Sequence, residues 1–162
     1  MFFFKQKRIR NTVYQMRDYF FEDFTIASYR CLLDIAKTNF EFTDYNCIDD
    51  SVRFILWRHD IDYSPHRALR LAEVEYERNV QATYFVWLHS NMYHFFEKEI
   101  SDILQKIMDY GHNIGLHFDA GYYGILNEQE LESHIRWERK ILEKTIGKKI
   151  FFFPVIIQIP IY

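Results

Sequence analysis

The chain of 162 residues has little cysteine, proline and glycine: two, three and five residues, respectively. Cys31 and Cys47 are too few and too far apart for a CxxC redox pair or a zinc knuckle. Two cysteines are typical of a reducing compartment, although their spacing leaves a disulfide between them open. Repeats, low-complexity segments and linker-like stretches are also absent, and the length is that of one ordinary domain.

An excess of charge of one sign is absent too. The chain has 20 basic and 23 acidic residues, so it offers no broad positive surface, and we expect no nucleic-acid partner. The N-terminus lacks the order of a signal peptide, in which charged residues precede an apolar run and small residues. The apolar stretch 150–162 is shorter than the roughly 20 residues of a membrane-spanning helix. We therefore predict a cytoplasmic protein without a membrane span.

What the sequence does contain is an alternation of helical and strand-like patterns. Hydrophobic periodicity predicts helices at 28–37, 64–79, 100–110 and 127–146, and strands at 40–45, 52–57, 80–88, 113–118 and 149–157. Ser64 before Pro65 and Asn127 before Glu130 are signals of a helix start. Leu69, Ala72 and Tyr76 are predicted to face inward from the helix 64–79. The order predicts an α/β fold with parallel strands joined by helical crossovers.

Polar side chains that could bind a metal follow three of these strands: His59, Asp60, Asp62, His89, Asn91, His117 and Asp119. The carboxyl ends of parallel strands meet at one edge of a sheet, so we expect these side chains to gather there. Asp60 and Asp62 are two apart, and two such charges repel unless a cation lies between them. A divalent metal held by Asp62 and His117 would leave Asp60 free as a general base. The same residues could also be no more than the solvated polar ends of strands.

Three motifs carry a family resemblance: RHDID at 58–62, ATYFV at 82–86 and YGHNIGLHFD at 110–119. Together they resemble the polysaccharide deacetylase (NodB-homology) family, and more narrowly an uncharacterised bacterial branch with HDxD and GHxIGLHxD motifs. That branch is often associated with surface-glycan synthesis. The resemblance covers roughly residues 53–120 and implies a partial (β/α) barrel. It also implies a metal-dependent hydrolase that removes an acetyl group from a sugar, with a carbohydrate as its partner.

The resemblance also implies roles for single residues. Asp60 matches the catalytic base, Asp62 the first metal ligand, and His117 the first histidine of the HxxxH ligand pair of the family. The metal implied is a divalent ion, usually zinc. It would polarise the acetyl carbonyl and stabilise the negative charge that develops on its oxygen.

One position departs from the family pattern. Gly121 stands four residues after His117, where the second histidine ligand belongs, and glycine has no ligand atom. Asp119 could take that place on the same side of the strand end, or His59 could turn in. A carboxylate-rich site would shift the preference toward harder metals.

We predict three segments: an N-terminal helical and edge-strand segment at 1–50, a partial deacetylase-like domain at 51–153, and an aberrant apolar tail at 154–162. The tail carries no acid, base or histidine. Our hypothesis is that the chain is the front part of a longer enzyme, ended by a frameshift near residue 152. An open sheet edge would then favour self-association.

Two alternatives to a deacetylase remain open. The chain could be a degenerate domain that binds a sugar or a protein without catalysis. It could also be another metal hydrolase, such as a phosphoesterase. Phosphate chemistry needs basic side chains at the site. Only Arg58 and Arg67 lie near the motif in the sequence, so this alternative ranks third.

Overall fold

The structure is a computed structural model that describes residues 24–150. The apolar tail, most of the strand expected at 149–157, and the first part of the segment 1–50 lie outside the described residues. The elements, in chain order, are α2 (Ile26–Asn39), β1 (Glu41–Thr43), β2 (Phe54–Leu56), β3 (Arg58–Ile61), α3 (Pro65–Glu77), β4 (Thr83–Trp87), α4 (Lys98–Asp109), β5 (Asn113–His117), α5 (Ala120–Tyr123) and α6 (Glu128–Ile146). None of the helices in residues 24–150 has both the length and the apolar character needed to cross a membrane.

The strands form two open parallel sheets. β1 pairs with β2, and a three-stranded sheet has the order β3-β4-β5. Helices connect β3 to β4 and β4 to β5, which confirms the predicted α/β class with parallel strands and helical crossovers. The division of the chain at residues 50 and 153, and self-association through an open edge, stay predictions.

The structure corrects the predicted start of the motif region. One buried strand was expected at 52–57, with His59 and Asp60 following it. Instead β2 belongs to the small sheet, and β3 begins at Arg58, so His59 and Asp60 lie within a strand and Asp62 follows it. The apolar pattern missed this because backbone pairing with β4 defines β3, whose first three side chains are polar.

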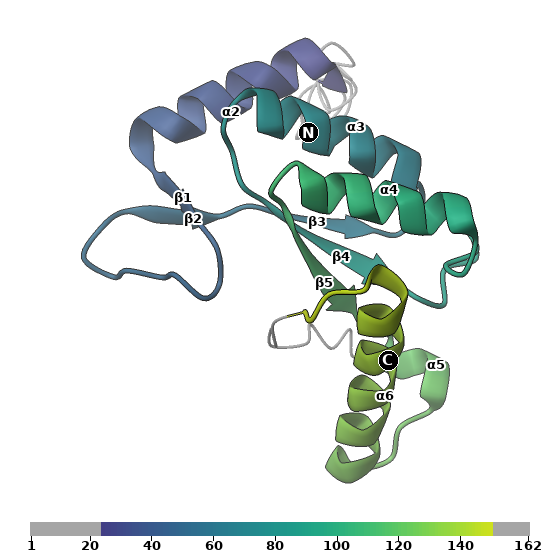
Figure 1. The fold of residues 1–162 in the computed structure, drawn as a ribbon. Coiled ribbons are helices and arrows are strands. Elements are labelled where there is room, and N and C mark those ends of the chain that lie inside the picture. The colour runs from purple at the N-terminus through teal and green to yellow at the C-terminus, as the bar shows by residue number, and fades with distance from the viewer. Residues whose placement is uncertain (1–23, 151–162) are drawn as a thin grey trace, which may run out of the picture.

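Helices cover one face of the three-stranded sheet (Figure 1). α3 and α4 lie side by side over it, α2 packs beside α3, and α6 contacts α4 and β5. The main core fills the space between the sheet and these helices; its fully buried members include Tyr84, Val86, Leu104, Ile107 and Leu142. A smaller cluster of Leu33, Val74 and Val80 joins α2 to α3. The carboxyl ends of the three strands are therefore held on a packed scaffold.

Local signals placed the helix starts correctly. The Ser64 hydroxyl accepts a hydrogen bond from the amide of Arg67 at 3.3 Å, and the Asn127 side chain accepts one from the amide of Glu130 at 2.9 Å. The expectation that Tyr76 faces inward is wrong, because its side chain is 55% exposed and stacks on Tyr110.

The end of α4 gives a testable expectation for stability. Gly111 follows the helix with φ +86°, a left-handed conformation that favours glycine, and an added Cβ would meet no atom within 4 Å. We expect Gly111→Ala to lower the free energy of unfolding by about 1–2 kcal/mol through backbone strain alone. Urea denaturation should show this loss, with little change for Gln105→Ala on the exposed side of α4. An unchanged midpoint for Gly111→Ala would contradict the assigned backbone conformation.

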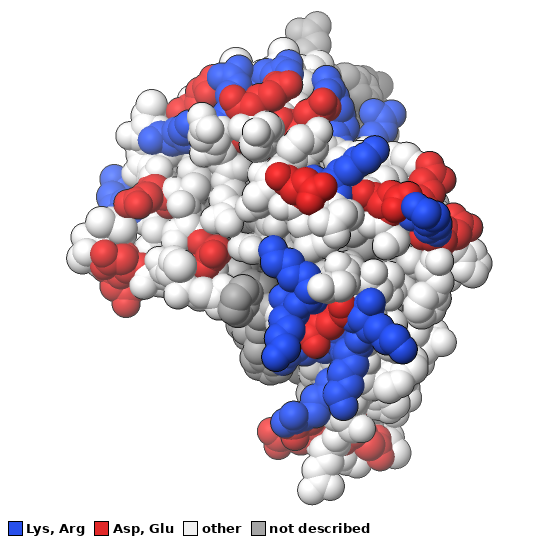
Figure 2. Space-filling model, viewed as in Figure 1, with Lys and Arg blue, Asp and Glu red and all other residues white. Residues whose placement is uncertain are grey.

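Charge is distributed less evenly than the near-neutral sum implies. On the face drawn in Figure 2, Lys and Arg side chains gather over α6. The later part of α6 and the turn after it carry Arg139, Lys140, Lys144, Lys148 and Lys149. Elsewhere on that face the two signs are interspersed. Cys31 and Cys47 are both exposed and free, so no disulfide joins them.

Candidate active site

The two faces of the sheet separate the residues of the RHDID motif. Successive side chains of a strand point to opposite faces. His59 points toward α3, where its Nε2 lies 2.5 Å from Oε1 of Glu75. Arg58 and Asp60 lie on the other face, over Phe85 of β4. His59, a possible replacement ligand by sequence, is therefore turned away from Asp60.

Asp62 and His117 meet at the carboxyl ends of β3 and β5. Oδ1 of Asp62 lies 2.9 Å from Nδ1 of His117. The two atoms are not aligned for a hydrogen bond. Both atoms are buried, and neither has a hydrogen-bond partner among the described residues. The strand register explains the meeting. Val86 of the central strand lies opposite Ile61 of β3, and the next residue, Trp87, lies opposite His117 of β5, so Asp62 and His117 end their strands at the same level.

This pair fits two positions of a metal site. Metal–ligand bonds of 2.0–2.2 Å in a tetrahedral site place neighbouring ligand atoms about 3.3–3.6 Å apart, so this pair, at 2.9 Å, would separate slightly to take an ion. Buried polar atoms without hydrogen bonds are uncommon in folded proteins and call for a partner such as a bound ion or water. A carboxylate oxygen with an imidazole nitrogen is a donor set that zinc accepts. Among residues 24–150, no group of three or more His, Cys, Asp or Glu side chains could hold a metal ion.

Asp119 stabilises the start of a short helix. It is the N-cap of α5, and its Oδ1 accepts hydrogen bonds from the amides of Gly121 at 2.9 Å and Tyr122 at 3.3 Å. A Cβ on Gly121 would lie 3.2 Å from that same oxygen. Glycine at this position therefore suits the tight cap. The structure does not bring Asp119 together with Asp62 and His117 as a third ligand.

Asp60 is fixed by an arginine from its own strand. Arg58 forms an ion pair with Oδ1 of Asp60, and its guanidinium carbon lies 4.5 Å from the centroid of the Phe85 ring. The Asp60 side chain is 36% exposed. The ring supports the arginine and the arginine orients the carboxylate. Asp60 is thus a positioned carboxylate open to water.

Sequence reasoning missed a second polar cluster near the strand ends. Nε2 of His89, which follows β4, lies 2.9 Å from Oε1 of Glu138, and the Tyr123 hydroxyl donates to the same oxygen at 2.7 Å. The His89 ring stacks on Tyr122 with centroids 3.7 Å apart. Glu138 is fully buried, and burial raises the pKa of its carboxyl above the usual value. Its position on the apolar stripe of α6, between Ile135 and Leu142, was the available sequence signal.

A third polar cluster lies on the α3 side of the sheet. Glu75 is fully buried and accepts hydrogen bonds from the hydroxyls of Tyr29 and Tyr84, beside its contact with His59. Burial by itself would raise the pKa of Glu75. The hydrogen bonds and charge of His59, with the tyrosine hydroxyls, outweigh burial and hold that pKa below its usual value. His59 is therefore a structural residue of the motif.

His112, the first histidine of the YGHNIGLHFD motif, is structural as well. It is buried, accepts a hydrogen bond from the amide of Ala82 at 3.1 Å, and places Nε2 2.9 Å from the carbonyl of Ala72. Burial lowers the pKa of His112, so the ring is neutral near pH 7. It joins α3 to the start of β4.

Comparisons with known proteins give similarity at the level of structure. No protein-family model matches the sequence, and no curated protein matches it. A solved structure of a family 4 carbohydrate esterase from Bacillus anthracis is similar, with a TM-score of 0.46 and 24% sequence identity. The match covers 74% of this chain and 54% of that chain, so this chain spans about half the length of the esterase. A similarity at this level leaves the reaction to be argued from the side chains.

Proposed function

We propose that the protein is a metal-dependent hydrolase that removes an acetyl group from a sugar or glycan precursor. The observation that carries this proposal is the 2.9 Å approach of Asp62 Oδ1 to His117 Nδ1. These residues come from two motifs far apart in the sequence, and both are ligands in the family that the motifs resemble. Their two buried atoms have no hydrogen bonds, which supports a shared cation.

Asp62 and His117 would hold the metal, and zinc is the ion that the resemblance implies. A bound divalent ion would polarise the acetyl carbonyl and stabilise negative charge on its oxygen. The remaining metal ligands would come from groups other than Asp62 and His117. Asp119 could contribute one if it left its cap on α5.

The remaining chemistry belongs to residues of this chain. Asp60 takes a proton from the attacking water, and Arg58 holds the carboxylate in one orientation for that step. β4 is the central strand, so its carboxyl end lies between those of β3 and β5. We assign the proton for the leaving amine or alkoxide to His89, which follows β4 and is held by Glu138.

A non-catalytic binding domain is the second candidate function. It is favoured by one observation, that no third ligand joins Asp62 and His117 in the part of the chain that is described. A phosphoesterase is less well supported, because Arg58 already pairs with Asp60.

The test is a product assay on the purified chain supplied with zinc. We expect release of acetate from an acetylated amino sugar or its oligomers, and no release of phosphate from phosphate esters. The Asp62→Ala, His117→Ala double variant should release no acetate. Release of phosphate, or equal acetate release by the double variant, would contradict the proposal.

A further inference from the structure

The outer side of α6 is separated from the side that packs on the rest of the chain. Glu138 and Leu142 of this helix are fully buried. Trp137, Lys140 and Lys144 are exposed. These three are spaced three and four residues apart, so they lie along one side of the helix, away from the buried stripe.

The positive charge on this outer side is not neutralised within the protein. Arg136 forms an ion pair with Glu132, and the guanidinium of Arg139 pairs with a glutamate one turn further on. Four exposed lysines of the helix and of the turn after it take part in no hydrogen bond or ion pair within residues 24–150: Lys140, Lys144, Lys148 and Lys149. Together with Trp137 we call them the lysine face, which belongs to the basic area over α6 in Figure 2.

The residue types of the lysine face are those of a surface that meets lipid. Trp137 is 52% exposed, whereas Trp57 and Trp87 are half-buried. Tryptophan is favoured at the bilayer interface, where its ring contacts acyl chains and its N–H meets headgroups. Lysine lays its methylene groups on apolar surface and keeps its ammonium at the headgroups. Clusters of at least four basic residues on an amphipathic helix are typical of binding to anionic lipid.

The sequence after the lysine face favours lipid over nucleic acid. Lys149 is followed, after Ile150, by the stretch 151–162, which has no charged side chain and lies outside the described residues. Binding to a membrane surface increases with apolar area as well as with positive charge. A nucleic acid offers no apolar layer to such a stretch. Bidentate contacts to phosphate are also more typical of arginine than of lysine.

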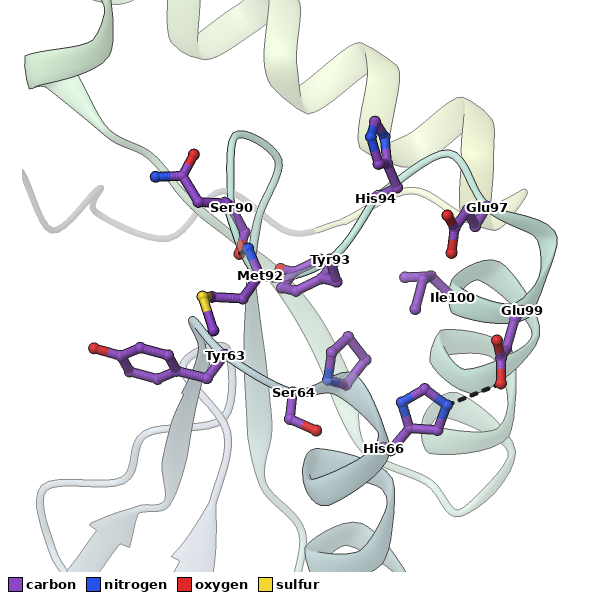
Figure 3. Close-up of a pocket in the computed structure, with 12 residues that line it drawn as sticks. Tyr63, Ser64, His66, Ser90, Met92, Tyr93, His94, Glu97, Glu99 and Ile100 are labelled. Atoms are coloured by element: carbon purple, nitrogen blue, oxygen red, sulfur yellow. Dashed lines mark hydrogen bonds and ion pairs between the residues drawn. The ribbon is translucent and has the colours of Figure 1, made fainter.

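The surface beside the candidate site has the opposite charge. A hollow of about 620 Å³ opens there, between the turn after β3 and the segment that leads from β4 into α4 (Figure 3). Glu97 and Glu99 belong to its lining, which contains no lysine or arginine among the described residues. His66 Nε2 lies 2.9 Å from Glu99 Oε1, as the dashed line in Figure 3 marks. An anionic membrane would be repelled at this hollow and attracted at α6.

We propose that the lysine face is a docking surface for an anionic lipid bilayer. Its lysines lie at the phosphates of the lipids, and Trp137 lies at the level of the headgroups. The charge pattern orients the chain, with α6 against the membrane and the hollow open to water. This inference goes beyond the proposed function and does not depend on it.

The experiment is sedimentation of the full chain with vesicles of equal parts phosphatidylcholine and phosphatidylglycerol, and with vesicles of phosphatidylcholine alone. We expect binding to the first vesicles only, and release as salt is raised. Lys140→Gln with Lys144→Gln should weaken binding about thirtyfold, since each charge near an anionic membrane contributes about fivefold. Lys98→Gln with Lys106→Gln removes the same charge from exposed positions of α4 and should bind like the wild type. Circular dichroism checks that each variant is folded.

Tryptophan fluorescence reports on the contact itself. The vesicles with phosphatidylglycerol should shift the emission of the wild type to the blue, because the exposed indole of Trp137 moves from water to the bilayer interface. Trp137→Phe should lose this shift and still sediment with the vesicles, because the lysines remain.

Three results would overturn the inference. The first is equal binding of the wild type to the two kinds of vesicle, or binding to neither. The second is an equal loss of binding for the α4 and the α6 lysine variants, which would mean that net charge and not the lysine face decides. The third is binding of a single-stranded thymidine oligonucleotide in place of vesicles, weakened by Lys140→Gln with Lys144→Gln, which would make the face a nucleic-acid surface.

Discussion

Glu75→Ala lowers the free energy of unfolding by about 3–5 kcal/mol, the cost of breaking a buried charged network by removing one partner. Glu75 is fully buried and is the common acceptor for Tyr29, Tyr84 and His59. Without it, the hydroxyls of Tyr29 and Tyr84 and the imidazole of His59 lose the carboxylate that all three contact. Urea denaturation followed by circular dichroism measures the loss.

Glu77→Ala is the matched control for this variant. Glu77 is two residues further along α3 and pairs with Arg30 at the surface. Exposed pairs contribute little, so the control should unfold close to the wild type. Equal midpoints for Glu75→Ala and Glu77→Ala would contradict the network.

The same network makes stability depend on pH. The pKa of Glu75 in the folded chain lies below its usual 4.5, so its stabilising contribution is present above pH 4.5. That contribution is lost as the pH falls from 4.5 through the folded pKa. Glu75→Gln should therefore flatten the acid limb of the stability curve.

Under the proposed function, we expect Asp60→Asn to lower kcat for acetate release by about 10²–10⁴-fold, the usual contribution of a general base. The amide keeps the shape of the side chain but cannot accept the proton from water. Asp60 pairs with Arg58 and is not one of the two proposed zinc ligands, so we expect KM and zinc uptake to change little. Steady-state kinetics measure the change.

Asp109→Asn provides a matched substitution away from the site. Asp109 is exposed at the end of α4, where it accepts a hydrogen bond from Gln105. This variant should keep the wild-type rate. An Asp60→Asn rate equal to that of Asp109→Asn would remove Asp60 from the reaction.

Features set by local chemistry could be predicted from the sequence. The starts of α3 and α6 depend on single side chains, Ser64 and Asn127, which hydrogen-bond to amides three residues away. Gly111 and Gly147 end their helices in left-handed conformations for the same local reason. The α/β class followed from the order of such segments.

Features that depend on tertiary partners were not predictable in the same way. Glu75 and Glu138 occupy inward positions on apolar stripes, but their hydrogen-bond partners come from residues distant in the sequence. The cap that Asp119 forms on α5 is local, yet it uses the carboxylate that the sequence offered as a substitute for the missing histidine ligand. Asp62 and His117 were paired from the motifs, and the roles of the site residues stay predictions.

A zinc titration by calorimetry tests most directly whether Asp62 and His117 hold a metal. His66→Ala with Glu99→Ala is the matched control, because that pair also has a nitrogen and an oxygen 2.9 Å apart but is exposed at the surface. We predict that the wild type and this control bind zinc alike, and that Asp62→Ala with His117→Ala abolishes binding. Equal zinc uptake by the wild type and the Asp62→Ala, His117→Ala variant would contradict the account.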